Sequence, residues 1–154
     1  MPKTQLSKQL VGFSGEHYVA SRLGLMGYVP LMTSSISSRY PGSDILVLNF
    51  SNGNKVDVQV KTMSYQKKLN WYVPEEVEEM DAIFVFNKIS EDKISIASYV
   101  VKANYVAKES KKQRDDYITN HPNVSEKQPR MISEDSLMKF SEKWDIFKEI
   151  LGEP

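Results

Sequence analysis

Apolar residues recur along this chain with two different periods, and these periods predict which segments are helical and which are extended. From residue 6 to about residue 26 they return at steps of three and four, which is typical of an amphipathic helix. The residues concerned are Leu6, Leu10, Phe13, Ala20 and Leu23. Gly27 follows and is expected to end this helix. A similar stripe from Ser133 to Leu151 predicts a last helix that faces the core.

The middle of the chain carries the patterns of strands. Short apolar or alternating runs bounded by turn residues occupy residues 28–32, 44–50, 55–62, 82–88 and 93–101. Residues 102–118 then have a helical pattern. A helix, a mostly antiparallel set of strands and further helices predict an α/β or α+β protein. At 154 residues we expect a single domain over residues 1–154.

The dipeptide Asn52-Gly53 separates two of these strands and is a strong signal for a two-residue hairpin turn. Such a turn predicts three cross-strand pairs: Asp44 with Lys61, Leu46 with Gln59, and Leu48 with Asp57. It also places five apolar residues together on the other face: Ile45, Val47, Val56, Val58 and Val60. A loop of four residues keeps this division between faces, whereas a loop of three breaks it.

The row of polar residues has two explanations. It is either a solvated sheet face, with a weak ion pair between Asp44 and Lys61, or a functional site. Leu46 and Leu48 in the same row need cover, which we expect from the N-terminal helix. Glu16 lies in the apolar stripe of that helix, where a carboxylate is unfavourable unless it is paired or bound to a cation. Alternatively, Glu16 reaches water at the edge of the stripe.

Three segments together resemble the PD-(D/E)xK nuclease superfamily: GFSGEHYVASRLGLMGY, GSDILVLNF and VDVQVKT. The branches with a Gln variant, as in Mrr-type restriction enzymes, look most similar. The resemblance covers residues 6–87 best. It implies a restriction-endonuclease-like fold, in which helices flank a central mixed sheet of about four to five strands.

The resemblance also implies roles for individual residues. Asp44 would be the metal-binding aspartate, Gln59 the second metal ligand and Lys61 the catalytic lysine. Glu16 would be the helix carboxylate, and the main-chain carbonyl of Val60 would complete the metal ligands. The implied activity is hydrolysis of phosphodiester bonds in DNA, with Mg²⁺ or Mn²⁺ as cofactor and a metal-bound water as nucleophile.

Two departures from the family pattern bear on that activity. The segment PGSD inserts two residues between proline and aspartate, and Gln59 replaces a carboxylate. Because the amide carries no charge, a single metal ion is expected rather than a pair. A module that has kept the fold, has lost catalysis and binds nucleic acid or a protein partner remains the alternative. Asp57 is expected at the rim of the site rather than among its ligands.

Charge changes this picture little. The 20 basic and 20 acidic residues cancel, so no overall positive field attracts nucleic acid. Contacts with nucleic acid are therefore expected from local groups of lysines: Lys67, Lys68, Lys108, Lys111 and Lys112. The basic run 102–114 and the acidic run 75–81 also fit solvated helix faces. A homodimer would help so small a protein to hold its substrate.

The remaining residue types mainly exclude functions. The chain has no cysteine, no apolar run near the ~18 residues of a membrane span and no signal peptide, which together predict a cytoplasmic protein without a membrane segment. His17 and His121 are expected on the surface and in a loop. Trp71 and Tyr72 fit either the core or base stacking.

Overall fold

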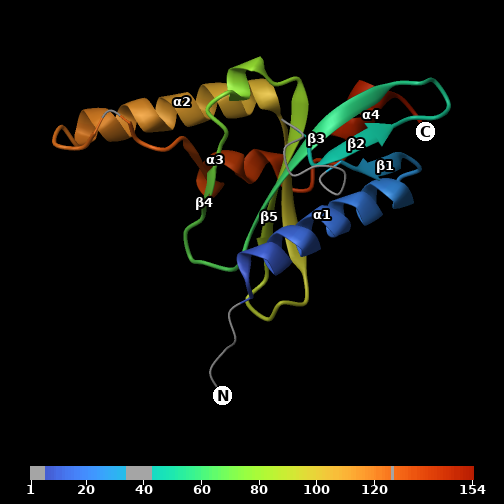
Figure 1. Ribbon diagram of the computed structural model, residues 1–154, viewed down its shortest axis with the longest axis horizontal. Helices are drawn as coiled ribbons and strands as arrows, with labels where there is room; N and C mark the ends of the chain where they lie inside the picture. Colours follow the sequence, from blue (N-terminus) through green and yellow to red (C-terminus); the bar gives the residue numbers. More distant parts are fainter. Residues whose placement is uncertain (1–5, 34–42, 126) are drawn as a thin grey trace.

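A five-stranded mixed sheet forms the centre of the computed structural model, which describes residues 6–33, 43–125 and 127–154 (Figure 1). Its strand order is β1-β2-β3-β5-β6. The strands are β1 (Val29–Met32), β2 (Ile45–Leu48), β3 (Lys55–Met63), β5 (Ala82–Ile89) and β6 (Ile96–Lys102). Neighbouring strands are antiparallel except β3 and β5, which run parallel. The mixed sheet of four to five strands flanked by helices is thus confirmed.

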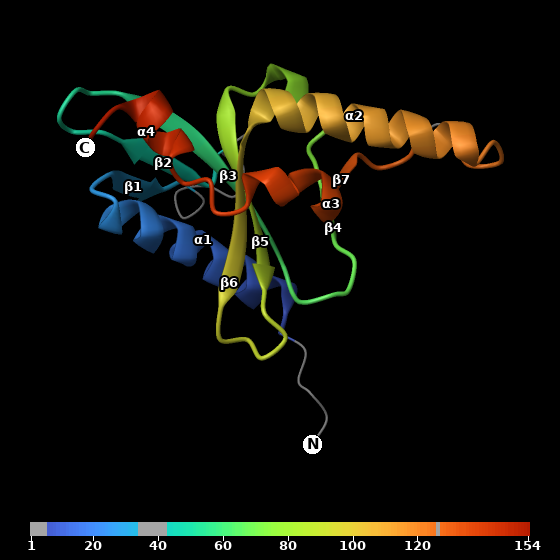
Figure 2. The same cartoon turned by 180° about the vertical axis from the view of Figure 1, so that it is seen from behind.

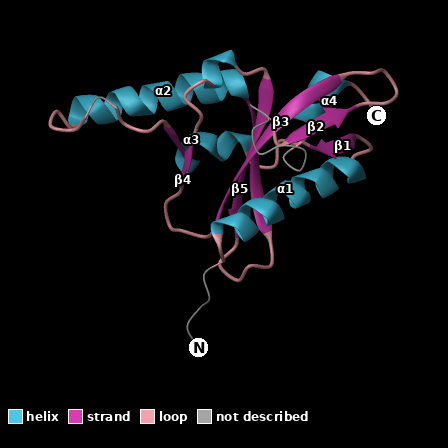
Figure 3. Cartoon of the chain, in the orientation of Figure 1, coloured by secondary structure: helices cyan, strands magenta, loops and turns pink. Residues whose placement is uncertain are grey.

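Helices and a small second ribbon cover this sheet (Figure 3). The helices are α1 (Lys8–Leu25), α2 (Ala103–Asn120), α3 (Glu134–Leu137) and α4 (Ile146–Leu151), with 3₁₀ turns η1 (Val77–Glu79) and η2 (Met138–Phe140). Strands β4 (Asn70–Tyr72) and β7 (Met131–Ser133) pair to form the ribbon. Within the described ranges no helix combines the length and the apolar character needed to cross a bilayer.

One face of the sheet is built from the apolar residues that the alternation in β2 and β3 predicted. Ile45, Val47, Val56, Val58 and Val60 are all buried there. They pack against α1 and α4, whose buried side chains in this core are Val19, Leu23, Ile146, Phe147 and Leu151. Full burial of each large apolar side chain stabilises the fold by about 1.5–3 kcal/mol, so this layer is a major source of stability.

The opposite face carries the polar row and a second core. Residues paired across parallel strands share a face, so Gln59 and Lys61 lie on the side of their partners Phe84 and Phe86. That side is covered by α2, α3 and the β4–β7 ribbon, whereas α1 lies across the other side (Figure 2). The prediction that the N-terminal helix covers the polar row is therefore wrong.

Helix α1 is also rotated relative to the predicted stripe. Its buried residues are Val11, Gly15, Val19 and Leu23, a row with a step of four. Leu10 and Phe13, which the pattern placed in the core, are 54% and 59% exposed. The cause lies in Gly15, because a Cβ built there would stand 1.7 Å from Thr62 Oγ1. This close approach of helix and strand selects the face of α1 that turns inward.

A buried hydrogen-bond network holds the crossing of α1 and β3. Asn87 Nδ2 donates to Gly15 O at 3.4 Å and to Thr62 Oγ1 at 3.3 Å. Ser98 Oγ donates to Asn87 Oδ1 at 2.7 Å. Asn87 and Ser98 are fully buried, so these bonds satisfy groups that water does not reach. The network ties α1 to three neighbouring strands at one point.

The hairpin register differs by two residues from the prediction. The observed pairs are Ile45 with Val58, Leu46 with Asp57, Val47 with Val56 and Leu48 with Lys55. Asn49 N donates to Asn54 O at 2.8 Å and Gly53 N to Asn49 O at 2.8 Å, so the loop has four residues, 50–53. Because a four-residue loop keeps the parity of the pairing, each side chain stays on its predicted face.

The longer loop follows from a contact with the end of α4. The side-chain amides of three asparagines, Asn49, Asn52 and Asn54, all donate to Leu151 O, at 2.8, 2.8 and 3.2 Å. Asn49 is 1% exposed and donates also to Glu153 O at 2.9 Å. These bonds satisfy the C-terminal carbonyls of α4 and require the loop to fold toward it.

The last helix of the prediction is interrupted in the structure. Instead of one helix over 133–151, α3 and η2 are followed by an extended segment and then α4. In that segment Glu142 N donates to Ser98 O at 2.8 Å, and Glu142 Oε1 accepts from Ser98 N at 2.9 Å. The segment thus pairs with the outer edge of β6, which a continuous helix does not do.

The tight crossing predicts opposite effects for two glycine-to-alanine substitutions in α1. Gly15→Ala should lower the free energy of unfolding by about 1–3 kcal/mol, because the methyl group collides with Thr62. Gly24→Ala is the matched control, since nothing lies within 4 Å of its added Cβ. It should raise stability by up to about 1 kcal/mol. Urea denaturation measures the free energy of unfolding of both variants. Equal stability of the two would contradict the close approach of Gly15 to Thr62.

Candidate active site

Asp44 stands where β2 departs from β3. Its amide donates to Val58 O at 2.9 Å, and its Oδ2 accepts a hydrogen bond from Val60 N at 2.8 Å. The ladder between the two strands ends at Ile45 with Val58. The Asp44 carboxylate therefore accepts the hydrogen bond from Val60 N that a backbone carbonyl of β2 would accept in a continued ladder. This bond holds the carboxylate beside residues 59–61.

The backbone of Asp44 is itself anchored. Its carbonyl accepts from Thr33 N at 3.0 Å, and Thr33 Oγ1 donates to Ser43 O at 2.9 Å. Thr33 and Ser43 are 5% and 4% exposed. Buried hydroxyls satisfied in this way restrict the start of β2 and thus the direction of the Asp44 side chain. No periodic signal in the sequence pointed to this anchor.

The surroundings of Asp44 disfavour its charge. Burial raises the pKa of the Asp44 carboxyl, while the hydrogen bond from Val60 N and the nearby Lys61 ammonium pull the pKa back down. A carboxylate whose charge is poorly solvated gains from a cation placed beside it. Perturbed carboxyls of this kind are common at functional sites, although structural ones occur as well.

Gln59 brings an oxygen atom without a partner to the same place. The residue is 9% exposed, and its Oε1 has no hydrogen-bond partner among the described residues. Extending the β2–β3 register by one residue on each strand puts Gln59 opposite Asp44. A buried polar atom left without a hydrogen bond costs about 1–3 kcal/mol. The unsatisfied amide oxygen beside a half-buried carboxylate indicates a place where a group with affinity for oxygen ligands could bind.

Lys61 completes the set that the structure brings together. It is half-buried, lies two residues beyond Gln59 on the same face of β3, and is close enough to Asp44 to lower the pKa of that carboxyl. No direct ion pair joins Lys61 to Asp44 in the described part of the chain. The simple cross-strand ion pair considered from the sequence is therefore not what is found.

Glu16 is placed differently from these three residues. It is half-buried and directly follows Gly15, the point at which α1 crosses Thr62 of β3. Because α1 covers the apolar face of the sheet, the predicted common pocket beneath the first helix is wrong. From Gln59 onward, however, β3 has passed the end of its ladder with β2. Glu16 is thus near a strand edge that β2 does not cover.

The metal ligands implied by the family pattern are not a cluster of acids. Among the described residues, no three His, Cys, Asp or Glu side chains are grouped so that they could hold a metal. The sheet contributes one carboxylate, Asp44, and one amide, Gln59. The N–H of Val60 is used by Asp44, and the role of the Val60 carbonyl stays a prediction.

Asp57 and Leu46 line a separate cavity of about 600 Å³ near the start of β3, β5 and α2. Its other charged residues are Lys55, Asp81 and Lys102. Asp57 lies two residues before Gln59 on the same strand face, away from the Lys61 end. Asp57 thus points to another cavity than the one expected, and its place at the rim of the site stays a prediction.

The candidate nucleic-acid contacts fall into two groups. Lys67 and Lys68 are exposed in the loop after β3, while Lys108, Lys111 and Lys112 are exposed on α2. Acidic residues of the segment 75–81 neutralise part of the α2 region. Glu75 accepts from Arg114 at 2.8 Å, and the pKa of Glu78 is lowered chiefly by its hydrogen bond from Arg130, with a smaller effect of Lys111.

The aromatic and histidine residues considered from the sequence are partly in the core and partly on the surface. Trp71 is 1% exposed and belongs to the core, whereas Tyr72 is 65% exposed. His17 is exposed and stacks on Phe13 with ring centres 4.0 Å apart. His121 is exposed at the end of α2. Neither histidine was placed in the site by the sequence.

Comparison with known proteins bears on the fold. No protein-family model matches the chain, and no curated protein matches its sequence. Among solved structures, the bacterial homing endonuclease I-Ssp6803I is similar, with a TM-score of 0.58 and 15% sequence identity over 94% of this chain and 94% of that one. A likeness at this identity concerns the fold, and it extends over nearly all of both chains. The mixed sheet flanked by helices is therefore the fold of a known endonuclease.

Proposed function

We propose that this protein is a metal-dependent nuclease that hydrolyses phosphodiester bonds in DNA. The observation that carries the proposal is the unpartnered Oε1 of Gln59 opposite the half-buried carboxylate of Asp44, with Lys61 next to them. The endonuclease with a similar fold supports DNA as the substrate. The relation to Mrr-type enzymes and the homodimer stay predictions.

The residues present fit a hard divalent cation. Mg²⁺ and Mn²⁺ prefer carboxylate and amide oxygens and tolerate water at the remaining positions. Asp44 and Gln59 would hold the ion from the sheet, and the Val60 carbonyl would add a neutral oxygen. Glu16 of α1 would add a second carboxylate. When bound, such an ion offsets phosphate charge and activates water for attack on phosphorus.

Lys61 has the position of a group that acts on the phosphate. Lys61 is half-buried and close to Asp44, so its ammonium would lie near the scissile phosphate. A cation fixed there stabilises the charge that develops on the phosphate oxygens in the transition state.

A non-catalytic module is the second candidate, and one observation favours it. Among the described residues, Asp44 belongs to no group of three His, Cys, Asp or Glu side chains, so the affinity for metal rests on few charges. If the protein only binds nucleic acid, it should take up no divalent metal at millimolar concentration. It should then also bind DNA equally well in Mg²⁺ and in EDTA.

The catalytic role of Lys61 predicts a large loss of activity on substitution. Lys61→Ala should lower the rate of Mg²⁺-dependent cleavage of a labelled DNA panel by at least about 10²-fold, because one fixed charge at the phosphate is removed. Lys148→Ala is the matched control, since Lys148 lies half-exposed on α4 at the opposite face. Equal cleavage by both variants would show that Lys61 takes no part.

If Gln59 is a metal ligand, its substitutions should change metal affinity and protein stability in opposite directions. Gln59→Glu should tighten Mn²⁺ binding about tenfold or more, because a carboxylate replaces a neutral oxygen. Gln59→Leu should abolish binding and raise the free energy of unfolding by about 1 kcal/mol, since it removes an unsatisfied buried atom. Calorimetric titration and urea denaturation in EDTA measure the two effects. Unchanged Mn²⁺ affinity in both variants would exclude Gln59 as a ligand.

The raised pKa of Asp44 predicts the sign of a pH effect. A pKa higher in the folded than in the unfolded state gives stability that is present below the unfolded pKa and is lost as pH rises through the folded pKa. In EDTA at pH 7–8, Asp44→Asn should therefore melt a few degrees above the parent protein, and the gap should close on acidification. Mg²⁺ should stabilise only the parent. A lower melting temperature of the variant at pH 7–8 would contradict this assignment.

A further inference from the structure

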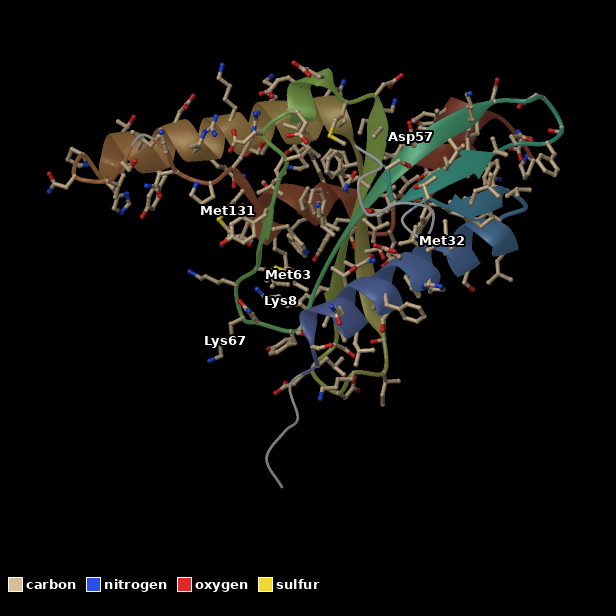
Figure 4. All side chains as sticks on the ribbon, in the orientation of Figure 1. Lys8, Met32, Asp57, Met63, Lys67 and Met131 are labelled. Atoms are coloured by element: carbon tan, nitrogen blue, oxygen red, sulfur yellow. The ribbon has the colours of Figure 1, made fainter. Side chains whose placement is uncertain are left out.

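The end of β3 beyond Lys61 carries an aromatic ring and lysines on the side of the candidate site. The register pairs Met63 with Lys88 of β5, and parallel partners share a face, so Lys88 lies on the face of Gln59 and Lys61. Figure 4 shows Met63 at the end of β3 and Lys67 extending outward from the loop that follows. This region is therefore a continuation of the site along the strand.

Lys88 is held in a partly buried network. Its ammonium lies 3.1 and 3.2 Å from the two carboxylate oxygens of Glu134, which also accepts from Tyr99 Oη at 2.7 Å. The side chains of Lys88 and Glu134 are 21% and 14% exposed. An ammonium fixed by two oxygens and shielded from water has little freedom to move.

The fixed ammonium in turn holds the ring of Tyr65. Lys88 Nζ lies 5.5 Å from the centre of that ring, within the range of a cation–π contact. Tyr65 is still 43% exposed, so much of the ring remains accessible to solvent. Nothing in the apolar cores accounts for an aromatic ring in this place, because Tyr65 belongs to neither cluster.

The loop that follows Tyr65 supplies positive charge. Gln66, Lys67 and Lys68 are exposed, and the two lysines form no ion pair with other described residues. An aromatic ring next to unpaired lysines is the combination with which proteins bind single strands, through base stacking and phosphate contacts. Four residues of extended chain span about 13 Å, so Tyr65 and Lys61 can contact nearby nucleotides of one strand.

Building on the proposed nuclease function, we propose that Tyr65 stacks on an unpaired base of the strand that is cut. Lys88, held by Glu134, is the positioning residue that orients the ring. Lys67 and Lys68 bind the neighbouring phosphates. The substrate then presents an unpaired base beside the cleavage position, either as a single strand or as a duplex opened there.

The test uses oligonucleotides in which 2-aminopurine replaces one base at a time, with EDTA present so that no strand is cut. Stacking on Tyr65 quenches 2-aminopurine fluorescence at one position. Tyr65→Leu should weaken binding to the single strand roughly 5- to 150-fold and should abolish this quenching. Tyr65→Phe should bind within about twofold of the parent protein, since the face of the ring is kept. Tyr117→Leu is the matched control, because Tyr117 is a tyrosine of similar exposure (45%) near the end of α2, outside this region.

A double-mutant cycle tests the positioning role of Lys88. Lys88→Gln should weaken binding in the parent protein but not in the Tyr65→Leu variant, because its effect acts through the ring. A purely structural role of Lys88 would lower affinity equally in both backgrounds. That outcome would remove Lys88 from the proposal.

The same measurements separate the inference from the proposed function. If Tyr65→Leu binds and quenches like the parent protein while Mg²⁺-dependent cleavage still requires Lys61, the stacking role is wrong and the nuclease function stands. If the parent protein neither binds nor cuts any nucleic acid, both are wrong. If Tyr65→Leu loses the quenching that the parent protein shows, the inference is supported. Quenching by the parent protein with single strands alone identifies a single-stranded substrate, and quenching with single strands and duplexes identifies a duplex that opens at the cleavage position.

Discussion

The hydrogen bond from Val60 N to the Asp44 carboxylate is the interaction on which the candidate site depends. This bond occurs where β2 departs from β3. Asp44 therefore ends the backbone ladder between the two strands and places its carboxylate at the same point. The departure leaves β3 from Gln59 onward without β2 at its side. An acid, an amide and an amine are thereby held together on one strand end, instead of being spread along a paired hairpin.

The candidate site is energetically unfavourable for the folded protein, and the rest of the fold compensates. Burial raises the pKa of Asp44, and Gln59 has a buried oxygen atom without a partner. Two apolar cores, one on each face of the sheet, supply the stability that tolerates both defects. Buried polar atoms usually have hydrogen-bond partners, and carboxylates are usually solvated or paired. Exceptions to both rules in an otherwise well-packed protein are typical of functional sites.

Local charge, rather than net charge, supports the proposed contact with nucleic acid. The acidic segment after β4 pairs with Arg114 and Arg130, which removes part of the positive field around α2. Lys67 and Lys68, in contrast, form no ion pair with the described residues, and they follow directly from the strand that carries Lys61. A net charge of zero is therefore compatible with a short basic surface at the end of β3.

The sequence by itself determined the five strands of the central sheet, the two faces of β2 and β3, and the grouping of Asp44, Gln59 and Lys61 on one of them. The period of two in β2 and β3 separates the valines from Asp44, Gln59 and Lys61, and that separation survives any even shift in register. The family resemblance then implied the roles of these residues and of Glu16. Local periodicity suffices for this, because which face a side chain occupies on a strand depends only on neighbouring residues.

Tertiary contacts decided the rest. The rotation of α1 follows from the approach of Gly15 to Thr62, and the four-residue hairpin loop follows from asparagine side chains that bind Leu151 about 100 positions away. The interruption of the last helix follows from the edge of β6, which Glu142 pairs with. Each of these outcomes depends on a partner far along the chain, so no local pattern of apolar and polar residues contains it.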